Sequence, residues 1–473
     1  MRQIPLAPQA LYKAPLGLLT DLYQLTMAYG YWKSGIHNRE SVFHLFFRSA
    51  PFHNGFALSA GLESAAGFIE NFGFSNEELT YLETLQGNDK KPLFEAAFLD
   101  FLRDLRFTGD IDGVPEGTAV FGNEPILRVK APLLEAQLLE TALLTIVNFA
   151  TLVTTKAARI VAAAEGDPVI EFGLRRAQGI DGGITATRSA FLGGCVGTSN
   201  VVAGKIFNIP VKGTHAHSWV MSFDSEEEAF ATYANAMPNN CIFLVDTYDT
   251  VEGVRKAIET GKELRKKGHE MVGIRLDSGD LAELSIAARS LLDEGGFPDA
   301  HIVASNDIDE HVIASLKMQG AKVDTWGVGT KLVTAFDQPA LGGVYKLAAI
   351  RDSPDQQWDY RIKLSNSPGK TSNPGIQQIR RVRDSNGTPL RDIIYCEETG
   401  VPDEAGDDLL QPIFRKGEMT WTPPTLEEAR TVAKEEWDTF GNPPVDVYEY
   451  SVELEPRLEA VKADLIKSAP KST

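Results

Sequence analysis

Four short polar clusters follow apolar, β-branched runs and are the residues of this chain best suited to chemistry. Asp246 follows IFLV, the segment DSGD (277–280) follows VGIRL, SND (305–307) follows IVA, and GTK (329–331) follows TWGV. Active sites of α/β barrels and open parallel sheets are built from the carboxyl ends of strands and the loops after them. The four clusters therefore predict a single site.

Glycines and cations near these clusters indicate an anionic substrate. Gly327 and Gly329 allow backbone N–H groups to approach a phosphate, although a tight turn between a strand and a helix would use the same glycines. Arg175 follows the apolar run VIEF and suits a carboxylate or phosphate, or a surface ion pair. Arg275 ends an apolar run, where an unpaired charge is costly, so we expect it to face Asp277 or a ligand anion.

Two histidines, His215 and His217, stand in the segment GTHAHSW (213–219). No third ligand stands nearby, so we do not expect a metal site. A functional imidazole would act as a base or nucleophile, whereas a structural one would cap an element or fill the core.

The elements that must position these residues form an alternating pattern from residue 169 onward. Apolar, β-branched runs are followed by helical patterns, which predicts a parallel sheet or a barrel. The predicted helices are Val251–Lys267, Leu281–Glu294 and Asp309–Gln319. The predicted strands are Val169–Phe172, Cys241–Val245, Met271–Leu276, His301–Ala304, Thr325–Val328 and Val344–Ile350.

The first third of the chain shows a different pattern. Residues 1–17 carry three prolines and read as an arm. Thr118–Val129 predicts a strand pair around a turn at Gly122-Asn123, and Leu133–Ala164 predicts one long helix without proline or glycine. Further elements are predicted as helices over Leu18–Trp32 and Leu58–Phe72, a strand over Val42–Phe47, and a helix beginning at Ser75.

The composition narrows the partners and the compartment. Lys and Arg total 46 and Asp and Glu total 65, so the net charge is −19, which argues against nucleic acid or an anionic membrane as main partner. The three cysteines, Cys195, Cys241 and Cys396, are too scattered for a disulfide framework. The N-terminus lacks the apolar core of a signal peptide, and no run approaches the roughly 18 apolar residues of a membrane span. We therefore expect a cytoplasmic protein.

Nine segments, in order, resemble nicotinate phosphoribosyltransferases. The combination of GT-x-AHS with LDSGD is specific, and the resemblance covers most of residues 18–350 and weakens beyond. The segments are LLTDLYQLTMAYGYW (18–32), FRSAPFHNGFALSAGLE (47–63), EFGLRRAQGIDGGITATRSAFLGGCVGTSNVVAG (171–204), GTHAHSWVMSF (213–223), LVDTYDT (244–250), GIRLDSGDL (273–281), SNDIDE (305–310), GVGT (327–330) and GGVYKLA (342–348).

The resemblance implies a reaction and a set of partners. Members of this family join nicotinate to 5-phosphoribosyl 1-diphosphate, which gives nicotinate mononucleotide and diphosphate in the salvage branch of NAD synthesis. They couple the reaction to ATP hydrolysis through a phosphohistidine and use Mg²⁺ with both phosphorylated substrates. The resemblance also implies a homodimer with shared active sites, and it leaves the magnesium ligands unidentified.

The motifs carry the implied roles onto single residues. His217 matches the phosphohistidine, with His215 at a variable position, and Asp277 matches the acid near the ribose and magnesium. An oxocarbenium-like transition state needs such a negative charge beside it. The residues matched to nicotinate are Tyr23, which stacks on the ring across the dimer interface, Phe172, Arg175, Thr214 and Arg275. Those matched to the phosphoribosyl group are Ser278, Gly279, Ser305, Asn306, Gly327, Gly329 and Thr330.

Pattern and resemblance together predict an α/β fold with two domains. An irregular α/β barrel over 147–350 holds the active site. A second, sheet-containing α/β domain is formed by 18–146 with 351–473.

Four alternatives stay open at this level. A nicotinamide phosphoribosyltransferase would carry an aspartate where Asn200 stands, and a quinolinate enzyme would need more clustered cations. A phosphosugar isomerase or aldolase would explain the phosphate site and leave GTHAHSW unexplained; an aldolase would also need a lysine in the barrel, and the nearest, Lys331, follows the phosphate loop. A non-catalytic relative would be expected to lack His217 or Asp277.

Overall fold

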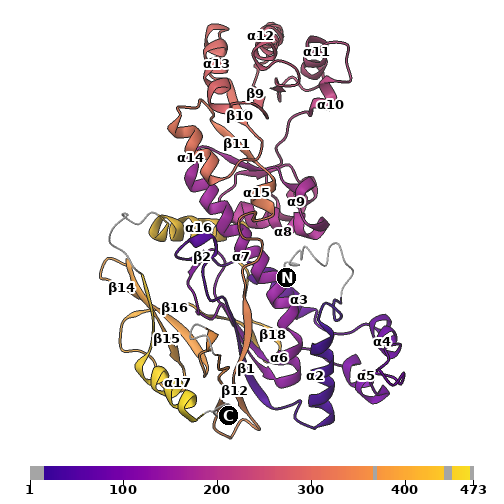
Figure 1. Ribbon diagram of the computed structural model, residues 1–473, viewed down its shortest axis with the longest axis vertical. Helices are drawn as coiled ribbons and strands as arrows, with labels where there is room; N and C mark the ends of the chain where they lie inside the picture. Colours follow the sequence, from indigo (N-terminus) through magenta and orange to yellow (C-terminus); the bar gives the residue numbers. More distant parts are fainter. Residues whose placement is uncertain (1–14, 366–369, 442–449, 469–473) are drawn as a thin grey trace. The chain divides into compact units, whose positions relative to one another are not determined.

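The computed structural model describes residues 15–365, 370–441 and 450–468. The chain divides into two compact units, one made of 1–152 with 340–473 and the other of 153–339 (Figure 1). The arm predicted over 1–17 falls almost wholly outside the described residues.

Six parallel strands form the sheet of the unit 153–339, in the order β7-β6-β11-β10-β9-β8. Parallel strands need helical crossovers, which explains the alternation seen in the sequence. The predicted α/β class, with a second sheet-containing unit, is confirmed. The strands are β6 (Val169–Glu171), β7 (Gly197–Thr198), β8 (Ile242–Leu244), β9 (Gly273–Leu276), β10 (His301–Ala304) and β11 (Thr325–Val328).

The crossover helices of this sheet begin at aspartate N-caps. Asp249, Asp280 and Asp309 each accept a hydrogen bond from a backbone N–H of the first turn. Their helices lie beside β9–β11 in Figure 1. They are α12 (Thr250–Lys266), α13 (Leu281–Glu294) and α14 (Glu310–Met318).

The two ends of the sheet, β7 and β8, are bridged by residues 210–215. Thr198 N donates to the Pro210 carbonyl at 3.0 Å, and Lys212 N donates to the Thr198 carbonyl at 2.8 Å. On the other side, Leu244 N of β8 donates to the imidazole Nε2 of His215 at 3.2 Å. The end strands β7 and β8 are therefore joined irregularly, because the His215 side chain stands where a neighbouring strand would otherwise pair with β8.

A mainly antiparallel, seven-stranded sheet forms the centre of the other unit, in the order β13-β12-β1-β5-β3-β17-β18. The predicted strand Val344–Ile350 belongs here and not with the barrel strands, because β12 pairs antiparallel with β1. The strands are β1 (Glu40–Phe46), β3 (Asp110–Gly113), β5 (Leu127–Pro132), β12 (Val344–Arg351), β13 (Asp359–Tyr360), β17 (Gln411–Arg415) and β18 (Glu418–Met419).

A second sheet in this unit comes from the C-terminal region, in the order β16-β14-β15-β19. Helix α17 (Pro456–Ser468) packs on it, and Leu458 of that helix is fully buried in the core beside Ile394. The strands are β14 (Gln377–Arg383), β15 (Pro389–Cys396), β16 (Gly406–Asp408) and β19 (Ser451–Leu454).

The strand pair predicted over Thr118–Val129 is wrong in its pairing. β4 (Ala119–Val120) pairs with β2 (Ala57–Leu58), and β5 pairs with β1 and β3. The turn at Gly122-Asn123 packs on the end of β1, because Asn123 N donates to the Phe47 carbonyl at 2.7 Å. This contact separates the two halves of the expected hairpin.

The helix predicted over Leu133–Ala164 is two helices, α6 (Leu133–Leu138) and α7 (Glu140–Ala163). Among the described residues, α7 is the one helix whose length and composition would let it cross a membrane, and 67 % of its most apolar window is buried inside the structure. That burial is typical of a core helix. The remaining helices of this unit are α2 (Leu22–Lys33), α3 (Leu62–Glu70), α4 (Asn76–Glu83), α5 (Ala96–Arg103) and α16 (Leu426–Phe440).

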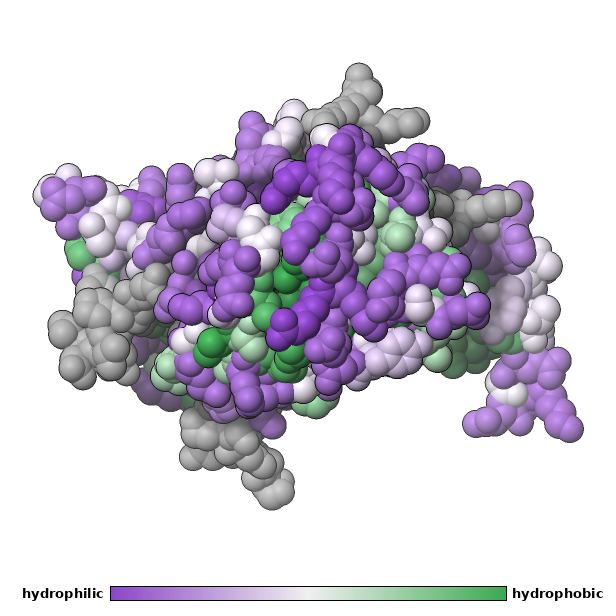
Figure 2. Space-filling view, turned by 90° about the horizontal axis from the view of Figure 1, so that it is seen from above, coloured by the Kyte–Doolittle hydropathy of each residue, from purple (hydrophilic) through white to green (hydrophobic). Residues whose placement is uncertain are grey.

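The face seen in Figure 2 is mainly hydrophilic, and hydrophobic side chains gather near its middle.

Candidate active site

His217 begins the short helix α10 (His217–Val220), and its side chain is 40 % exposed. Its Nδ1 lies 3.1 Å from the Thr247 hydroxyl. Its Nε2 lies 3.6 Å from Asp277 Oδ2 and 4.0 Å from Asp246 Oδ1. One ring nitrogen is thus held by a hydroxyl and the other faces two carboxylates, which suits a nucleophile or a proton-transfer group.

Asp246 fixes the loop that follows β9. Its Oδ2 accepts hydrogen bonds from Asp277 N at 2.9 Å and from the Ser278 hydroxyl at 2.6 Å. Its Oδ1 is buried without a hydrogen-bond partner among the described residues, and the side chain is 1 % exposed. A buried carboxylate oxygen without a partner costs free energy, so this oxygen is suited to a cation or donor brought by a ligand.

The residues of the DSGD segment (277–280) have different roles: Gly279 and Asp280 shape the backbone, and Asp277 faces the site. Gly279 has a φ of +78°, which favours glycine. Asp280 caps α13 by accepting from two backbone N–H groups at 3.0 and 3.1 Å. Asp277 is left to face His217, and its Oδ1 accepts from the Ser305 hydroxyl at 2.5 Å.

Arg275 contacts the loop that carries His215 and His217. Its Nη2 donates to the His215 carbonyl at 2.9 Å, its Nη1 lies 4.0 Å from Asp277 Oδ1, and its Nε is buried without a partner among the described residues. Burial lowers the pKa of Arg275; Asp277 and Asp246 oppose this, and the charge of Arg175 adds to it. Guanidinium groups are suited to binding a carboxylate or phosphate, so this part of the site is suited to an anionic ligand.

The Phe172 ring lies against the backbone of β11 at Gly327. A Cβ on Gly327 would lie 2.7 and 2.8 Å from two carbons of that ring and 3.4 Å from the Ser305 Cβ. Gly327 is therefore required by the ring and lies within the strand. Gly329 follows the strand and immediately precedes α15 (Thr330–Val333), so the end of β11 offers Gly329 and Thr330 to a phosphate.

Asn306, in the loop after β10, has a φ of +135°, a region that residues with side chains rarely adopt. The loop is held by Ile308 N, which donates to the Asn306 carbonyl at 2.7 Å. Strained backbone of this kind concentrates at ligand-binding sites.

Glu171 anchors the turn that carries Phe172 and Arg175. Its carboxylate accepts from Gly173 N, from the Thr187 hydroxyl at 2.9 Å and from the Thr198 hydroxyl at 2.6 Å. Burial raises the pKa of Glu171, and these three hydrogen bonds oppose the rise.

Asn200, considered above as the position of an aspartate in nicotinamide enzymes, is fully buried. Its Oδ1 caps α9 (Val201–Phe207) by accepting from Ala203 N at 3.2 Å. Its Nδ2 donates to the Thr187 hydroxyl at 3.2 Å and to the Gly183 carbonyl at 3.3 Å. The side chain therefore carries no charge here and its polar atoms are used within the fold.

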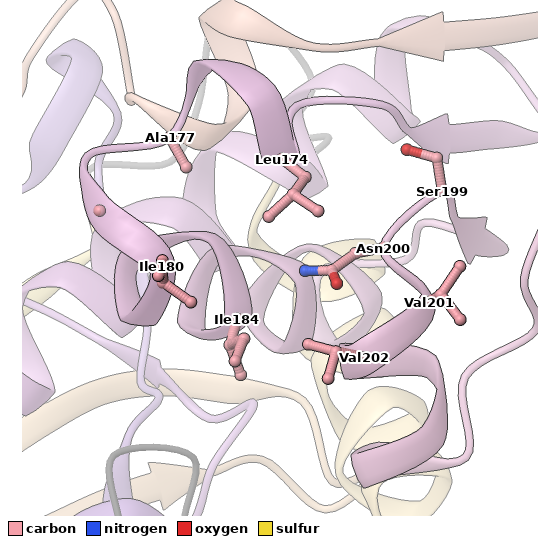
Figure 3. Close-up of a pocket in the computed structure, with 9 residues that line it drawn as sticks. Leu174, Ala177, Ile180, Ile184, Ser199, Asn200, Val201 and Val202 are labelled. Atoms are coloured by element: carbon pink, nitrogen blue, oxygen red, sulfur yellow. The ribbon is translucent and has the colours of Figure 1, made fainter. Parts of the chain in front are cut away.

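An apolar pocket of about 540 Å³ lies beside Asn200, between α8 (Gly179–Leu192) and α9. Leu174 and Asn200 point toward its middle (Figure 3). Ile180 and Val201 at its rim are 68 % and 69 % exposed. Exposed aliphatic side chains around a pocket are typical of a binding surface. The lining residues are Leu174, Ala177, Gly179, Ile180, Ile184, Ser199, Asn200, Val201 and Val202.

The two histidines of 213–219 lie outside any strand and have different surroundings. His215 is 7 % exposed and its ring packs edge-on against Tyr233, with 4.9 Å between centroids. Burial lowers the pKa of His215 to about 4, so it is neutral at pH 7. The preceding residue, Thr214, is half-buried, and its hydroxyl donates to the His215 carbonyl at 3.2 Å.

In the part of the chain that the structure describes, one group of three potential metal ligands comes together: Glu310, His311 and Asp337. Lys156 forms ion pairs with both carboxylates, and Arg159 Nε lies 2.8 Å from Glu310. The group excludes His215 and His217, and its negative charge is already balanced by protein cations.

Comparisons with known proteins identify the family. The model of the nicotinate phosphoribosyltransferase (NAPRTase) N-terminal domain matches residues 18–148, and that of the NAPRTase family matches 168–385. A nicotinate phosphoribosyltransferase from Bacillus subtilis is 48 % identical over 84 % of this chain and 80 % of its own. The chain belongs to the nicotinate phosphoribosyltransferase family.

Solved structures give the same result for the fold. The crystal structure of human nicotinic acid phosphoribosyltransferase superposes with a TM-score of 0.81 at 32 % identity, over 94 % of this chain and 99 % of that one. A nicotinate-nucleotide pyrophosphorylase from Pyrococcus furiosus shares the fold, with a TM-score of 0.70 at 22 % identity over 92 % and 99 % of the two chains.

Within this member of the family, contacts link two groups of predicted residues. His217, Asp277 and Ser305 follow one another in a chain, and the Phe172 ring lies against the backbone at Gly327. The charge of Arg175 contributes to the lowered pKa of Arg275. Tyr23 lies on α2 in the other unit, where it is 49 % exposed.

Two residues at the site were given no role from the sequence. Asp246 was predicted to lie at the site as a polar residue at a strand end, and Thr247 was not predicted at all. Both stand in the segment LVDTYDT, at the end of β8, so position after a strand is a usable signal. Which of the several polar residues there faces His217 depends on the fold.

Proposed function

We propose that this chain forms nicotinate mononucleotide and diphosphate from nicotinate and 5-phosphoribosyl 1-diphosphate, in NAD salvage. Family membership supports the substrates. The observation that carries the proposal is the cluster at His217, where Asp277 and Asp246 lie within 4.0 Å of one ring nitrogen at the ends of parallel strands.

Nicotinate binding is assigned to two cations and an aromatic ring. Arg175 and Arg275 supply charge for the carboxylate, and the Thr214 hydroxyl supplies a further donor. The Phe172 ring offers an apolar face for the pyridine, which orients its nitrogen for attack. The buried amide of Asn200 favours the acid over nicotinamide, because it provides no carboxylate to repel nicotinate.

Ribosyl transfer forms a bond between the pyridine nitrogen and the anomeric carbon and breaks the bond from that carbon to diphosphate. Positive charge develops on the ribose ring as the diphosphate departs with the bonding electrons. Asp277 provides the negative charge that stabilises this state, and Ser305 holds its other oxygen in place. We assign the sugar 5-phosphate to the strand-end loops at 278–279, 305–306 and 329–330.

ATP coupling is assigned to His217. Its Nδ1 is engaged by Thr247, so Nε2 is the nitrogen free to accept the γ-phosphoryl group, with release of ADP. Water later cleaves the N–P bond and releases inorganic phosphate. This step predicts acid-labile, alkali-stable label from γ-labelled ATP that disappears in His217→Ala.

Magnesium suits the carboxylates at this site. The oxygens Asp246 Oδ1 and Asp277 Oδ2 both face the same ring nitrogen, the first is buried without a partner among the described residues, and Mg²⁺ prefers oxygen ligands. We assign the ion to Asp246 and Asp277. When bound, it would neutralise developing charge on the phosphates.

A homodimer with shared sites is supported by unpartnered apolar residues on both units. On α2 and just before it, Leu19, Leu22 and Tyr23 are 39 %, 53 % and 49 % exposed, and the pocket of Figure 3 has an exposed aliphatic rim. We infer that Tyr23 completes the site of a second copy. Mixing Tyr23→Ala with His217→Ala protein should restore part of the activity that each lacks, whereas a fully active monomer would contradict shared sites.

The reaction itself is tested by product formation. Purified protein with nicotinate, 5-phosphoribosyl 1-diphosphate, ATP and Mg²⁺ should yield nicotinate mononucleotide, and Asp277→Asn should lower kcat with little change in the KM for nicotinate. Absence of the mononucleotide with the unaltered protein would overturn the proposal. We place the reaction in the cytoplasm, consistent with a chain that carries only three cysteines, all of them buried.

A further inference from the structure

His215 occupies the gap between the two end strands of the parallel sheet. On the edge of β8 that faces away from β9, Leu244 N has no strand beside it and donates to the His215 Nε2 at 3.2 Å. The other N–H on that edge, Ile242 N, is satisfied locally by the Asn240 carbonyl at 3.0 Å. One imidazole thus takes the place of a strand-to-strand hydrogen bond.

The backbone of His215 is fixed as firmly as its ring. Its carbonyl accepts from Arg275 Nη2 at 2.9 Å, so the residue is tied to both β8 and β9. The ring is enclosed by aromatic side chains, with centroids of Tyr233, Phe230 and Phe243 at 4.9, 6.1 and 6.5 Å. His217 stands two residues further along the same segment.

We propose that His215 is a positioning residue that latches residues 213–217 to β8 and so holds His217 against Thr247 and Asp277. This inference rests on the proposed role of His217. The latch requires a lone pair on Nε2, and therefore a neutral ring with its proton on Nδ1. The lowered pKa of His215, about 4, keeps that form at neutral pH.

The same contacts exclude His215 as a second phosphoryl acceptor. Its Nε2 already accepts the Leu244 N–H, its Nδ1 lies 3.4 Å from the Ala216 carbonyl, and the residue is 7 % exposed. A phosphoryl group on Nε2 would displace the Leu244 N–H, and one on Nδ1 would displace the contact with the Ala216 carbonyl. The two histidines of GTHAHSW therefore have separate tasks.

The test compares variants that keep or remove the acceptor. In His215→Gln the amide oxygen can occupy the place of Nε2, whereas His215→Phe keeps an aromatic ring without an acceptor at that place. His215→Met provides a second variant without the imidazole acceptor and with a different shape. The exposed His311 supplies the control, His311→Gln.

Two measurements are made on the full-length protein: hydrogen exchange of the Leu244 amide, and the rate at which γ-labelled ATP labels His217. We expect His215→Phe and His215→Met to speed exchange of that amide by about tenfold or more and to slow labelling by a similar factor, since each lost hydrogen bond loosens the segment. His215→Gln and His311→Gln should stay within about threefold of the unaltered protein in both.

Labelling at the original rate in His215→Phe and His215→Met, or a Leu244 amide that stays protected in them, would overturn the latch. The proposal would also be overturned if His215→Gln slowed labelling of His217 as much as His215→Phe does, because the hydrogen-bond acceptor at this position would then be irrelevant. If the unaltered protein takes up no label, the proposed role of His217 fails. The latch is then tested through the ¹⁵N shift of the His217 Nδ1, which should change in His215→Phe and stay unchanged in His215→Gln.

Discussion

Substitution of Gly327 by alanine tests whether the Phe172 ring is held where the nicotinate site requires it. The added Cβ would lie 2.7 and 2.8 Å from two ring carbons, inside the distance that carbon atoms tolerate, so the ring or the strand must move. Overpacking of this kind costs about 1–3 kcal/mol. The unit from 153 to 339 has 339 − 153 + 1 = 187 residues, so we expect its Tm to fall by about 2–4 °C per kcal/mol.

The activity should fall in a defined way. A displacement of about 1 Å at a substrate-positioning group lowers the rate by about a hundredfold, so kcat/KM for nicotinate should drop by about ten- to a hundredfold. KM for 5-phosphoribosyl 1-diphosphate should change much less. Thermal unfolding and initial-rate kinetics measure both effects.

A matched substitution, Gly182→Ala, provides the control. It lies in α8 with nothing within 4 Å of the added Cβ, so it should raise stability by about 0.5–1 kcal/mol and leave the kinetics unchanged. The double variant Gly327→Ala with Phe172→Ala should recover part of the lost Tm, because the clash is removed. Unchanged Tm and unchanged kcat/KM for nicotinate in Gly327→Ala would refute the reasoning.

Three further substitutions probe the remaining parts of the site. Asp246→Asn keeps an acceptor for the loop after β9 but loses the charge near His217, so kcat should fall about 10- to 100-fold (about 1.4–2.7 kcal/mol) at nearly constant Tm; a kcat within twofold would contradict this. Asn306 has a φ of +135°, which glycine adopts without strain, so Asn306→Gly should raise the free energy of unfolding by about 1 kcal/mol. The same substitution should raise KM for 5-phosphoribosyl 1-diphosphate. A lower Tm would show that the loop is unstrained. The pKa of His215 is lowered from 6.5 to about 4, so between pH 6.5 and 4 the unfolded chain binds more protons than the folded one. The free energy of unfolding should therefore fall by up to about 3 kcal/mol as the pH drops from 6.5 to 4. His215→Gln should reduce this pH dependence in urea titrations at several pH values, and an unchanged dependence would contradict the prediction.

The parallel sheet was the part of the fold most open to prediction. Strands β10 and β11 have the bounds predicted for them, because buried parallel strands read as continuous apolar runs between turn signals. The hairpin predicted around Gly122-Asn123 was wrong. The sequence of this turn is typical of a hairpin, and only a long-range contact with the end of β1 separates the neighbouring strands. The strand predicted over Val344–Ile350 was placed in the wrong sheet, because a β-branched run does not reveal which sheet it joins.

The site was predictable in its residue types and less so in its geometry. The spacing of His215 and His217 does not reveal which ring is buried. In the structure, residue His215 is 7 % exposed, whereas the side chain of His217 is 40 % exposed. Gly327 looked like part of a phosphate loop, yet it lies inside β11 against an aromatic ring. Such distinctions depend on neighbours that are distant in sequence.

Competition between pyridine bases tests the central claim most directly. With 5-phosphoribosyl 1-diphosphate, ATP and Mg²⁺ fixed, kcat/KM is measured for nicotinate, nicotinamide and quinolinate. The pair of arginines and the uncharged Asn200 predict that nicotinate is preferred over both by at least about a hundredfold, the discrimination available from a charged, hydrogen-bonded substrate group. A higher kcat/KM for nicotinamide or quinolinate would contradict the account.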